Sequence, residues 1–503
     1  MPVLAAIDVG SNAIRLLVGN VDGDRLIDIL ESVRDPVRLG QDVFTRGIIT
    51  EETIDRATEA FLRFKQLIVA HNVKLTRAVA TSAVREALNR DLFVDRVAQA
   101  TGIDISVIST EEEARLIHLA VSSKVNLKNK LAILADIGGG STEITLVSDG
   151  TIISTESFKM GAVRLLQVLE ERKHGERQFN QMVREYVDAT QKRIRKEIGH
   201  EKIDFLVGTG GNIESLGELR KELFKKDRNS IIGADELETL VKKLQSMSFE
   251  ERIQQLHLRP DRADVIVPAS IVLQKIVKQA GVDEVLIPGV GLKDGLLVDM
   301  IHELYGKKTH LSRDQVITSA LRLGRKYLFD EQHGLTVAKL AVKLFDETRS
   351  LHNLNLEYRL VLEVAALLHD IGQFVNAVDH HKHTQYLLLA TPLIGLDESQ
   401  MSIVSNVARY HRKSFPKPQH ELYRALSPKE RVIVTKLAAL LRLADAMDNE
   451  HASKVLDFEM EYKKPKLVMK LNGEGDMLLE RWALMKKSSM LEEVFSVEFS
   501  IEE

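Results

Sequence analysis

The sequence predicts an α/β fold built from a duplicated unit, followed by a region of helices. Two segments, 7–12 and 135–143, share one pattern, in which an apolar run ends in Asp and continues into glycines and a hydroxyl residue. Each is typical of a strand that opens into a phosphate-holding turn. The similarity continues downstream: Asp22-Gly23 in the first copy matches Asp149-Gly150 in the second, at an offset of 127 residues. Two such turns facing each other would form a phosphoryl-transfer cleft.

Each copy of the unit begins with hairpins and continues with alternating helices and strands. The Asp-Gly pairs are typical of tight hairpin turns. The first copy predicts a helix over 51–71, a strand over 75–81, a helix over 83–100 and a strand over 103–108. The second predicts a strand over 131–135, a charged helix over 176–199, and strands over 204–207 and 284–287. This alternation is typical of α/β domains.

Four segments are predicted along the chain. At 503 residues it is long enough for several domains. The composition turns polar near 305–308, and eleven of the sixteen histidines follow residue 300, which sets the helical region apart. Alternating stretches at 467–471 and 494–499 predict a small α+β piece at the C-terminus. The predicted segments are 1–125, 126–305, 306–450 and 451–503.

Composition narrows the function classes. The chain is 44% hydrophobic and 28% charged, with a net charge of −4, which gives no global attraction to nucleic acid. No apolar run approaches the roughly 18 residues of a membrane helix, so we expect a cytoplasmic protein without nucleic-acid or membrane partners. Cysteine is absent, which leaves carboxylates and imidazoles as the side chains available to bind metals.

Glycine-bearing strand ends supply the candidate phosphate-binding turns. Glycine lets backbone amides approach phosphate oxygens because it has no Cβ. Two further glycine turns, at 208–212 and 289–291, add to the two matched turns. The four turns together favour phosphate binding over the alternative, which is structural hairpin corners. The candidate residues are Gly10, Ser11, Asn12, Gly138, Gly139, Gly140, Ser141, Thr142, Gly208, Gly210, Gly211 and Asn212.

Acidic side chains beside these glycines predict a magnesium site. Asp8, Asp136 and Glu143 would repel a phosphate chain unless a cation lay between them. We therefore expect Mg²⁺ as a cofactor. For Glu143 the alternative is an outward-facing strand position.

Glu113 and Arg85 each allow two interpretations. Glu113 ends an acidic run, 111–113, that opens a helix, where carboxylates are favourable. A Glu at this place could instead orient and deprotonate a water molecule. On the residues alone, capping is the stronger interpretation. Arg85 could bind a phosphate bidentately or simply be solvated.

These motifs resemble those of the exopolyphosphatase and guanosine pentaphosphate phosphohydrolase (Ppx/GppA) family, over essentially the full length of the chain. Segments 6–16 and 136–143 resemble the two phosphate motifs of that family. Segments 80–85, 112–115 and 208–212 follow in its order and spacing. The resemblance implies a duplicated actin-like, ribonuclease-H-like fold of the ATPase type.

The resemblance also implies roles for individual residues. Glu113 would be the water-activating base, and Asp136 and Glu143, with Asp8, would support magnesium. Asn12, Arg15, Arg85 and the glycine turns would hold the terminal phosphates. Ala13 departs from the family pattern, because a small hydroxyl residue is expected there.

The helical region resembles an HD-type metal phosphohydrolase domain, whose pattern is a His, a His-Asp pair and a later Asp. His333, His369, Asp370 and Asp445 fit this pattern and suit a second divalent ion such as manganese, iron, zinc or magnesium. A purely structural set is one alternative. A basic lining for a long anion is another, formed by His380, His381, His383, Arg409, His411, Arg412 and Lys413.

The function expected from these features is an exopolyphosphatase that removes terminal phosphate processively from linear polyphosphate, using magnesium and a Glu113-activated water. Hydrolysis of guanosine pentaphosphate (pppGpp) to ppGpp, a stringent-response activity, is the nearest alternative. An actin-like ATPase or a nucleotide sensor is a third. The family resemblance further implies a homodimer.

Overall fold

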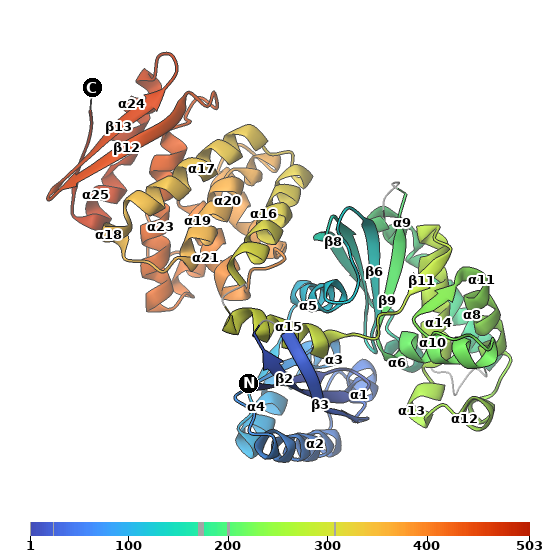
Figure 1. Cartoon of the computed structure of the whole chain (residues 1–503). Helices are drawn as coiled ribbons and strands as arrows, with labels where there is room; N and C mark the ends of the chain where they lie inside the picture. The colour runs from blue at the N-terminus through green and yellow to red at the C-terminus, as the bar shows by residue number, and fades with distance from the viewer. Residues whose placement is uncertain (1, 24, 170–175, 199–201, 306–307, 503) are drawn as a thin grey trace. The chain divides into compact units, whose positions relative to one another are not determined.

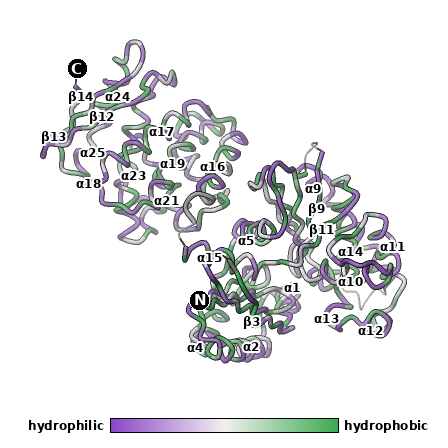
Figure 2. The backbone as a smooth tube through the Cα atoms, viewed as in Figure 1, coloured by the Kyte–Doolittle hydropathy of each residue, from purple (hydrophilic) through white to green (hydrophobic). Residues whose placement is uncertain are grey.

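The computed structural model describes residues 2–23, 25–169, 176–198, 202–305 and 308–502. They form two compact units, Met1–Leu311 and Ser312–Glu503, which we call the N-terminal and the C-terminal unit (Figure 1). Hydrophobic and hydrophilic residues are interleaved along the elements of both units (Figure 2), as expected for amphipathic elements packed on a core. No helix in the described ranges has the length and apolar character needed to cross a membrane.

The first sheet of the N-terminal unit has five strands in the order β3-β2-β1-β4-β5. They are β1 (Val3–Val9), β2 (Ile14–Asp22), β3 (Arg25–Asp35), β4 (Leu75–Ala80) and β5 (Ile105–Val107). Strand β1 pairs antiparallel with β2 and parallel with β4. It is buried at six of its seven positions, as expected for a central strand covered on both faces.

The second sheet repeats this arrangement, in the order β10-β11-β9-β6-β7-β8. Its strands are β6 (Leu131–Ile137), β7 (Thr142–Ser148), β8 (Thr151–Phe158), β9 (Phe205–Thr209), β10 (Ile231–Gly233) and β11 (Glu284–Leu286). Strand β6 pairs antiparallel with β7 and parallel with β9, so it takes the place that β1 has in the first sheet. The predicted duplication, and with it the α/β actin-like class, is confirmed.

Helices cover both sheets. They are α1 (Leu39–Arg46), α2 (Glu51–Ala70), α3 (Ser82–Glu86), α4 (Arg90–Thr101), α5 (Thr110–Ser122), α6 (Ala162–Val168), α8 (Glu176–Ala189), α9 (Gln191–Ile198), α10 (Gly211–Leu223), α11 (Ala234–Gln245), α12 (Phe249–Leu256), α13 (Pro260–Ala263), α14 (Ile266–Ala280) and α15 (Leu292–Leu304). Helix α15 follows the second sheet in sequence but packs on β1, β2 and α5 (Figure 1). It therefore belongs structurally with the first sheet, although the sequence boundaries assigned it to 126–305.

Two predicted helices are interrupted. The prediction over 83–100 becomes α3 and α4, because the Asn89 side chain exchanges hydrogen bonds of 2.9 and 2.8 Å with the backbone of Ile49. Such side-chain bonds compete with helical ones. The prediction over 176–199 becomes α8 and α9, and residue 199 lies outside the described residues.

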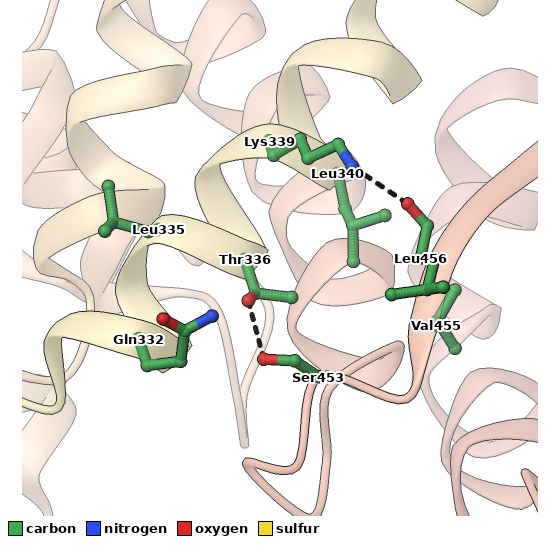
Figure 3. A pocket seen from close by; sticks show the side chains of 8 residues that line it. All are labelled: Gln332, Leu335, Thr336, Lys339, Leu340, Ser453, Val455 and Leu456. Carbon is green, nitrogen blue, oxygen red and sulfur yellow. Dashed lines mark hydrogen bonds between the residues drawn. The ribbon is translucent and has the colours of Figure 1, made fainter. Parts of the chain in front are cut away.

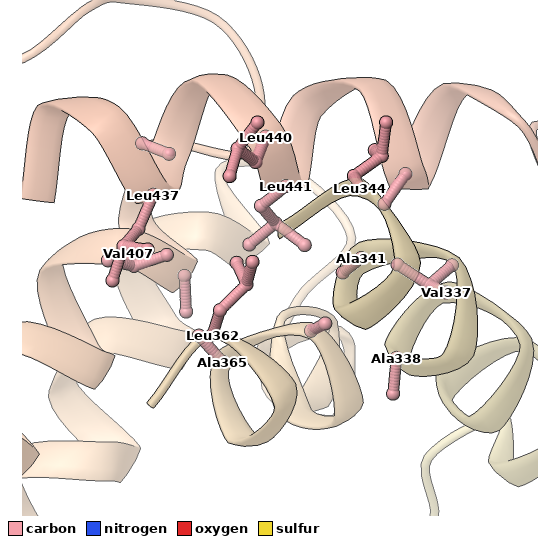
Figure 4. Packing of buried hydrophobic residues seen from close by; sticks show 14 of the residues in the cluster. Val337, Ala338, Ala341, Leu344, Leu362, Ala365, Val407, Leu437, Leu440 and Leu441 are labelled. Atoms are coloured by element: carbon pink, nitrogen blue, oxygen red, sulfur yellow. The ribbon is translucent and has the colours of Figure 1, made fainter. Parts of the chain in front are cut away.

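The C-terminal unit is a helical bundle with a three-stranded sheet, in the order β12-β13-β14. Its elements are α16 (Lys308–Lys326), α17 (Glu331–Glu347), α18 (Arg349–His352), α19 (Glu357–Leu368), η1 (Ile371–Phe374), α20 (His380–Ala390), α21 (Glu398–Arg409), α22 (Glu421–Arg424), α23 (Pro428–Ala446), β12 (Val455–Lys463), β13 (Lys466–Gly473), α24 (Leu478–Lys487), α25 (Ser489–Phe495) and β14 (Glu498–Ile501). Leu344, Leu362 and Leu441, from α17, α19 and α23, pack in one core (Figure 4).

The strand predicted over 494–499 is wrong in its first half. Val494 and Phe495 end helix α25, and β14 begins only at Glu498. The apolar residues Met490, Leu491 and Val494 are spaced as on one helix face, so the helical period decides the conformation there.

Candidate active site

The two predicted turns have the same backbone geometry. The Gly10 amide donates to the Ala13 carbonyl at 3.2 Å, and the Gly138 amide donates to the Ser141 carbonyl at 3.1 Å. The turns lie in contact, since a Cβ added to Gly139 would come 3.0 Å from Cβ of Ser11. The duplication therefore places two glycine turns against each other, as the sequence predicts.

The turn at 208–212, at the end of strand β9, lies against the second glycine turn. Gly210 has φ 96°, and a Cβ there would lie 2.7 Å from the Ile137 carbonyl oxygen, so only glycine fits without strain. A Cβ on Gly211 would lie 3.4 Å from Nη2 of Arg15. The turn at 289–291 instead starts helix α15, where the Gly291 amide donates to Oδ2 of Asp294 at 2.8 Å.

Three buried carboxylates converge beside the turns. Glu113 comes from α5, and Asp136 and Glu143 face each other across the β6–β7 pair. One carboxylate oxygen of each lies within 4.8 Å of the others. Because directly opposed residues of antiparallel strands project from the same face, the hairpin itself brings Asp136 and Glu143 together. Glu143 is 2% exposed, which rules out the outward-facing alternative.

The carboxylates of this cluster have raised pKa values. Burial and the neighbouring Asp136 raise the pKa of Glu143 to about 7. Burial and Glu143 raise the pKa of Glu113 well above its usual range, and burial also raises the pKa of Asp136. Oε2 of Glu143 is buried and has no hydrogen-bond partner in the described part of the chain. An all-oxygen set of this kind fits the preference of Mg²⁺.

Glu113 is not the cap of its helix. Oγ of Ser109 accepts from the Glu112 amide at 3.2 Å and caps α5. Glu113 is buried, and its Oε2 accepts from Nη1 of Arg85 at 3.2 Å. The same Arg85 nitrogen donates to the Ile108 carbonyl at 2.7 Å. Arg85 therefore orients Glu113 rather than being solvated, and the capping interpretation is wrong.

The remaining predicted residues surround this centre. Asp8 lies outside the carboxylate trio and accepts from Nη1 of Arg15 at 2.8 Å. The hydroxyl of Thr209, at the end of β9, donates to Oδ1 of Asp136 at 2.6 Å. Ser11 and Thr142 are hydrogen-bonded to Ser82 and to the Met160 carbonyl. Both hydroxyls therefore hold the turns in shape.

Buried arginines near the glycine turns were missed. Arg262, on the short helix α13, is 5% exposed and donates to Oδ1 of Asn212. Burial, with Arg15 and Arg34 nearby, lowers the pKa of Arg262 to about 10, so it remains charged at neutral pH. The Asn12 side chain donates to the Asp261 carbonyl at 3.1 Å, which ties the first turn to the same helix. No sequence motif marks Arg262, because tertiary packing alone brings it here.

The four residues of the predicted second metal site also meet. Nε2 of His369 lies 3.3 Å from Nε2 of His333, 3.6 Å from Oδ1 of Asp445 and 3.7 Å from Oδ1 of Asp370. His380 and His411, which were candidates for a basic lining, are buried beside them. The C-terminal unit therefore contains a separate cluster of imidazoles and carboxylates.

A pocket between α17 and β12 is not part of either cluster. Gln332, Leu340 and Leu456 are among its lining residues, and Thr336 and Lys339 are already engaged there in hydrogen bonds to Ser453 and to the Leu456 carbonyl (Figure 3). The hydroxyls of Thr336 and Ser453 and the Lys339 amine are thus engaged by the protein itself.

Paired phosphate turns around buried carboxylates, on a duplicated actin-like α/β fold, define a class of phosphate-cleaving enzymes. Residues 17–304 match the Ppx/GppA phosphatase family, and residues 316–493 match domain III of the Ppx/GppA phosphatases. The chain belongs to the Ppx/GppA phosphatase family, and is a hydrolase that acts on phosphoanhydride bonds.

Individual relatives carry both names of this family. The chain is 27% identical over 444 residues to a guanosine-5'-triphosphate,3'-diphosphate pyrophosphatase of Vibrio parahaemolyticus, covering 88% of this chain and 87% of that protein. The crystal structure of an exopolyphosphatase from Cytophaga hutchinsonii matches 60% of this chain and 98% of its own, with 26% identity and a TM-score of 0.55. An Aquifex aeolicus member of the Ppx/GppA family matches the same shares with 25% identity and a TM-score of 0.51.

Proposed function

We propose that the protein is an exopolyphosphatase that releases terminal phosphate from linear polyphosphate with Mg²⁺. The observation that carries the proposal is the convergence of Glu113, Asp136 and Glu143 beside two facing glycine turns. Bound to Asp136 and Glu143, with Asp8 nearby, Mg²⁺ would neutralise charge on the phosphate oxygens. The turn amides, Asn12 and Arg15 would position the terminal phosphoryl group.

Glu113 is assigned the role of general base. Its carboxylate accepts a proton from a water molecule as the water oxygen attacks the terminal phosphorus. The bridging P–O bond breaks, so the products are orthophosphate and a chain one unit shorter that ends in an anionic oxygen. Positioning and charge stabilisation supply most of the rate in such transfers. The bonds from Arg85 support this role because they hold Glu113 in one orientation.

The arginines beside the turn at 208–212 support an extended anionic substrate. Arg15 and Arg34 both lower the pKa of Arg262, and Arg15 lowers that of Arg34, while Arg262 keeps its charge at neutral pH. Several cations near one turn match the regularly spaced charges of a phosphate chain.

Hydrolysis of pppGpp to ppGpp is the second candidate. It uses the same phosphate chemistry, and it is favoured by the names of the relatives that match most of the chain. Under either candidate we propose a cytoplasmic homodimer with an HD-type fold in its C-terminal unit.

The test is phosphate release with Mg²⁺ from long-chain polyphosphate and, in parallel, from pppGpp. Wild type is compared with Glu113→Gln and with Glu111→Gln, a matched change in the same first turn of α5. Rapid release from polyphosphate that only Glu113→Gln removes supports the proposal. Release mainly from pppGpp selects the second candidate, and activity that survives Glu113→Gln overturns the assigned base.

A further inference from the structure

We propose that Asp299, on helix α15, is a positioning residue for the general base Glu113. It acts through Arg115, which lies on the same helix α5 as Glu113 and pairs with Asp299. The inference rests on the proposed function, because it assigns a supporting residue to the base of that reaction. It is carried by a set of ion pairs and by one close backbone contact, which together fix the place of α5.

Asp299 joins two arginines that come from different elements. Its side chain belongs to a residue that is 3% exposed, and its Oδ1 accepts from Nη1 of Arg115 at 2.9 Å. Its Oδ2 accepts from Nη1 of Arg77, on strand β4, also at 2.9 Å. Since each oxygen has its own charged donor, the carboxylate is fixed in direction. Helices α5 and α15 and strand β4 are therefore held together at this point.

Arg115 links the Asp299 carboxylate to the first turn of α5. Its Nε and Nη2 donate to the Glu112 carboxylate at 2.7 and 2.8 Å, which is the bidentate geometry of strong arginine–carboxylate pairs. Burial lowers the pKa of Arg115, but the bonds to Glu112 and Asp299 outweigh it and raise that pKa above its usual range. Because Glu112 directly precedes Glu113, the charged guanidinium ties the turn that carries the base to α15.

A close backbone contact sets the distance between the two helices. A Cβ added to Gly295, on α15, would lie 1.8 Å from the Leu116 carbonyl oxygen of α5. No side chain separates the helices here, so α5 cannot move closer to α15. Asp299 lies about one turn further along α15, and its pair with Arg115 keeps α5 from moving away. The contact and the ion pair thus limit α5 in opposite directions.

The rotation of α5 about its axis decides where Glu113 points. Successive residues of an α-helix are about 100° apart around the axis, so Glu112 and Glu113 face different sides. Glu112 is held by Arg115, whereas Glu113 is directed to Arg85 and to the other two carboxylates of its cluster. A rotation of α5 would carry the Glu113 carboxylate away from its water. A misplacement of about 1 Å can cost about 100-fold in rate.

The competing interpretation is a stabilising ion pair with no part in the reaction. Its loss would then reduce the amount of folded enzyme, while each folded molecule would still work at the normal rate. A positioning role instead lowers the rate of each folded molecule, and only while Glu113 is present to be positioned. A double-mutant cycle between Asp299 and Glu113 separates the two interpretations, because effects of residues that act as a unit are not additive.

The test measures kcat and KM for phosphate release with Mg²⁺, on whichever of long-chain polyphosphate and pppGpp the wild type cleaves. The proteins are wild type, Asp299→Asn, Glu113→Gln and the double variant. Asp299→Asn should lower kcat by about 10–100-fold and leave KM within about twofold of wild type, because the phosphate turns are unchanged. In the Glu113→Gln background the same change should lower the residual rate by less than about threefold.

Two further variants control the experiment. Glu303→Gln is the matched control, since Glu303 lies about one turn beyond Asp299 on α15 and pairs with the same Arg77. It should keep the kcat of wild type. Arg115→Lys keeps the positive charge but loses the planar group that bonds Glu112 and Asp299 together, so it should also lower kcat. Circular dichroism gives the folded fraction of each protein, and Arg115→Lys carries the test if Asp299→Asn does not fold.

The outcomes separate this inference from the proposed function. A wild-type kcat per folded molecule in Asp299→Asn and Arg115→Lys, or a loss confined to KM, overturns the positioning role and leaves the base in place. Losses that multiply in the double variant also overturn it. Full activity in Glu113→Gln overturns the base itself, and the positioning role with it.

Discussion

The carboxylate cluster of the N-terminal unit and the imidazole cluster of the C-terminal unit both lie largely below the surface but differ in chemistry. Glu113, Asp136 and Glu143 offer only oxygens, and burial raises the pKa of each, with a neighbouring carboxylate of the cluster adding to the shift at Glu113 and Glu143. The second cluster offers four imidazoles around two carboxylates, Asp370 and Asp445, which outweigh burial and raise the pKa of His369 to about 9. The donor atoms, rather than the depth of burial, would therefore decide which ion each proposed site accepts.

The two clusters are also assembled differently. Asp136 and Glu143 face each other on one hairpin, so local strand register sets their geometry. In the second cluster, His369 ends α19, His411 follows α21 and Asp445 lies at the end of α23. Helix packing alone brings these positions together, as the shared core of α17, α19, α21 and α23 shows (Figure 4). Errors in helix packing would therefore affect the imidazole site first.

The largest expected effect is that a substitution in each cluster removes the function of that cluster and leaves the other cluster unchanged. Glu113→Gln should reduce phosphate release by about 10²–10⁴-fold, because it removes the proton acceptor, while Co²⁺, used as a probe of the predicted second metal site, stays bound. Asp370→Asn should remove the Co²⁺ and leave the fold intact. Phosphate assays and metal analysis on the same preparations check this. Loss of Co²⁺ in Glu113→Gln would contradict the independence of the two sites.

The contrast in assembly limits what sequence can reveal. Matched strand–turn motifs predicted the glycine turns, Asp136 and Glu143, because those residues are neighbours in one hairpin. Arg262 could not be predicted, since a four-residue helix delivers it from far along the chain. On the residues alone Glu113 was assigned to capping, although Ser109 caps α5, and only the family resemblance gave Glu113 the role of base. His380 and His411 were assigned to a basic lining, because only the folded structure shows that both rings face Asp370.

The next effect concerns the support of His333. Asp448→Asn should weaken Co²⁺ binding at His333 by about 10–100-fold, because the carboxylate no longer orients the His333 ring or raises its basicity. Asp346→Asn is the control, since Asp346 lies on helix α17, as His333 does, and pairs with Arg359 at the surface. Co²⁺ titrations give both affinities. Equal affinities in the two variants would remove Asp448 from the site.

The raised pKa of Glu143 should couple magnesium binding at the carboxylate cluster to pH. Burial raises the pKa of Glu143 to about 7, above its ordinary 4.5. The folded protein then holds a proton that the unfolded chain has lost, so this group lowers stability as pH rises from about 4.5 to 7. Mg²⁺ must displace that proton, so its affinity should rise by up to about tenfold per pH unit below pH 7 and level off above it. Calorimetry across this range checks the slope, and a flat profile would exclude Glu143 as a ligand.

The smallest expected effect comes from the hydroxyl of Ser157, a neutral group that orients Glu143 as the charged Asp448 orients His333. Oγ of Ser157 donates to Oε1 of Glu143 at 2.8 Å and stabilises its anionic form. Ser157→Ala should raise the pKa of Glu143 further and weaken Mg²⁺ binding by roughly 5–10-fold, the loss expected for one neutral donor to a carboxylate. Ser154→Ala, on the same strand β8, removes a buried hydroxyl that has no partner in the described residues and should leave the affinity unchanged. A larger loss in Ser157→Ala than in Asp448→Asn would show that the hydroxyl, and not the carboxylate, is the stronger support.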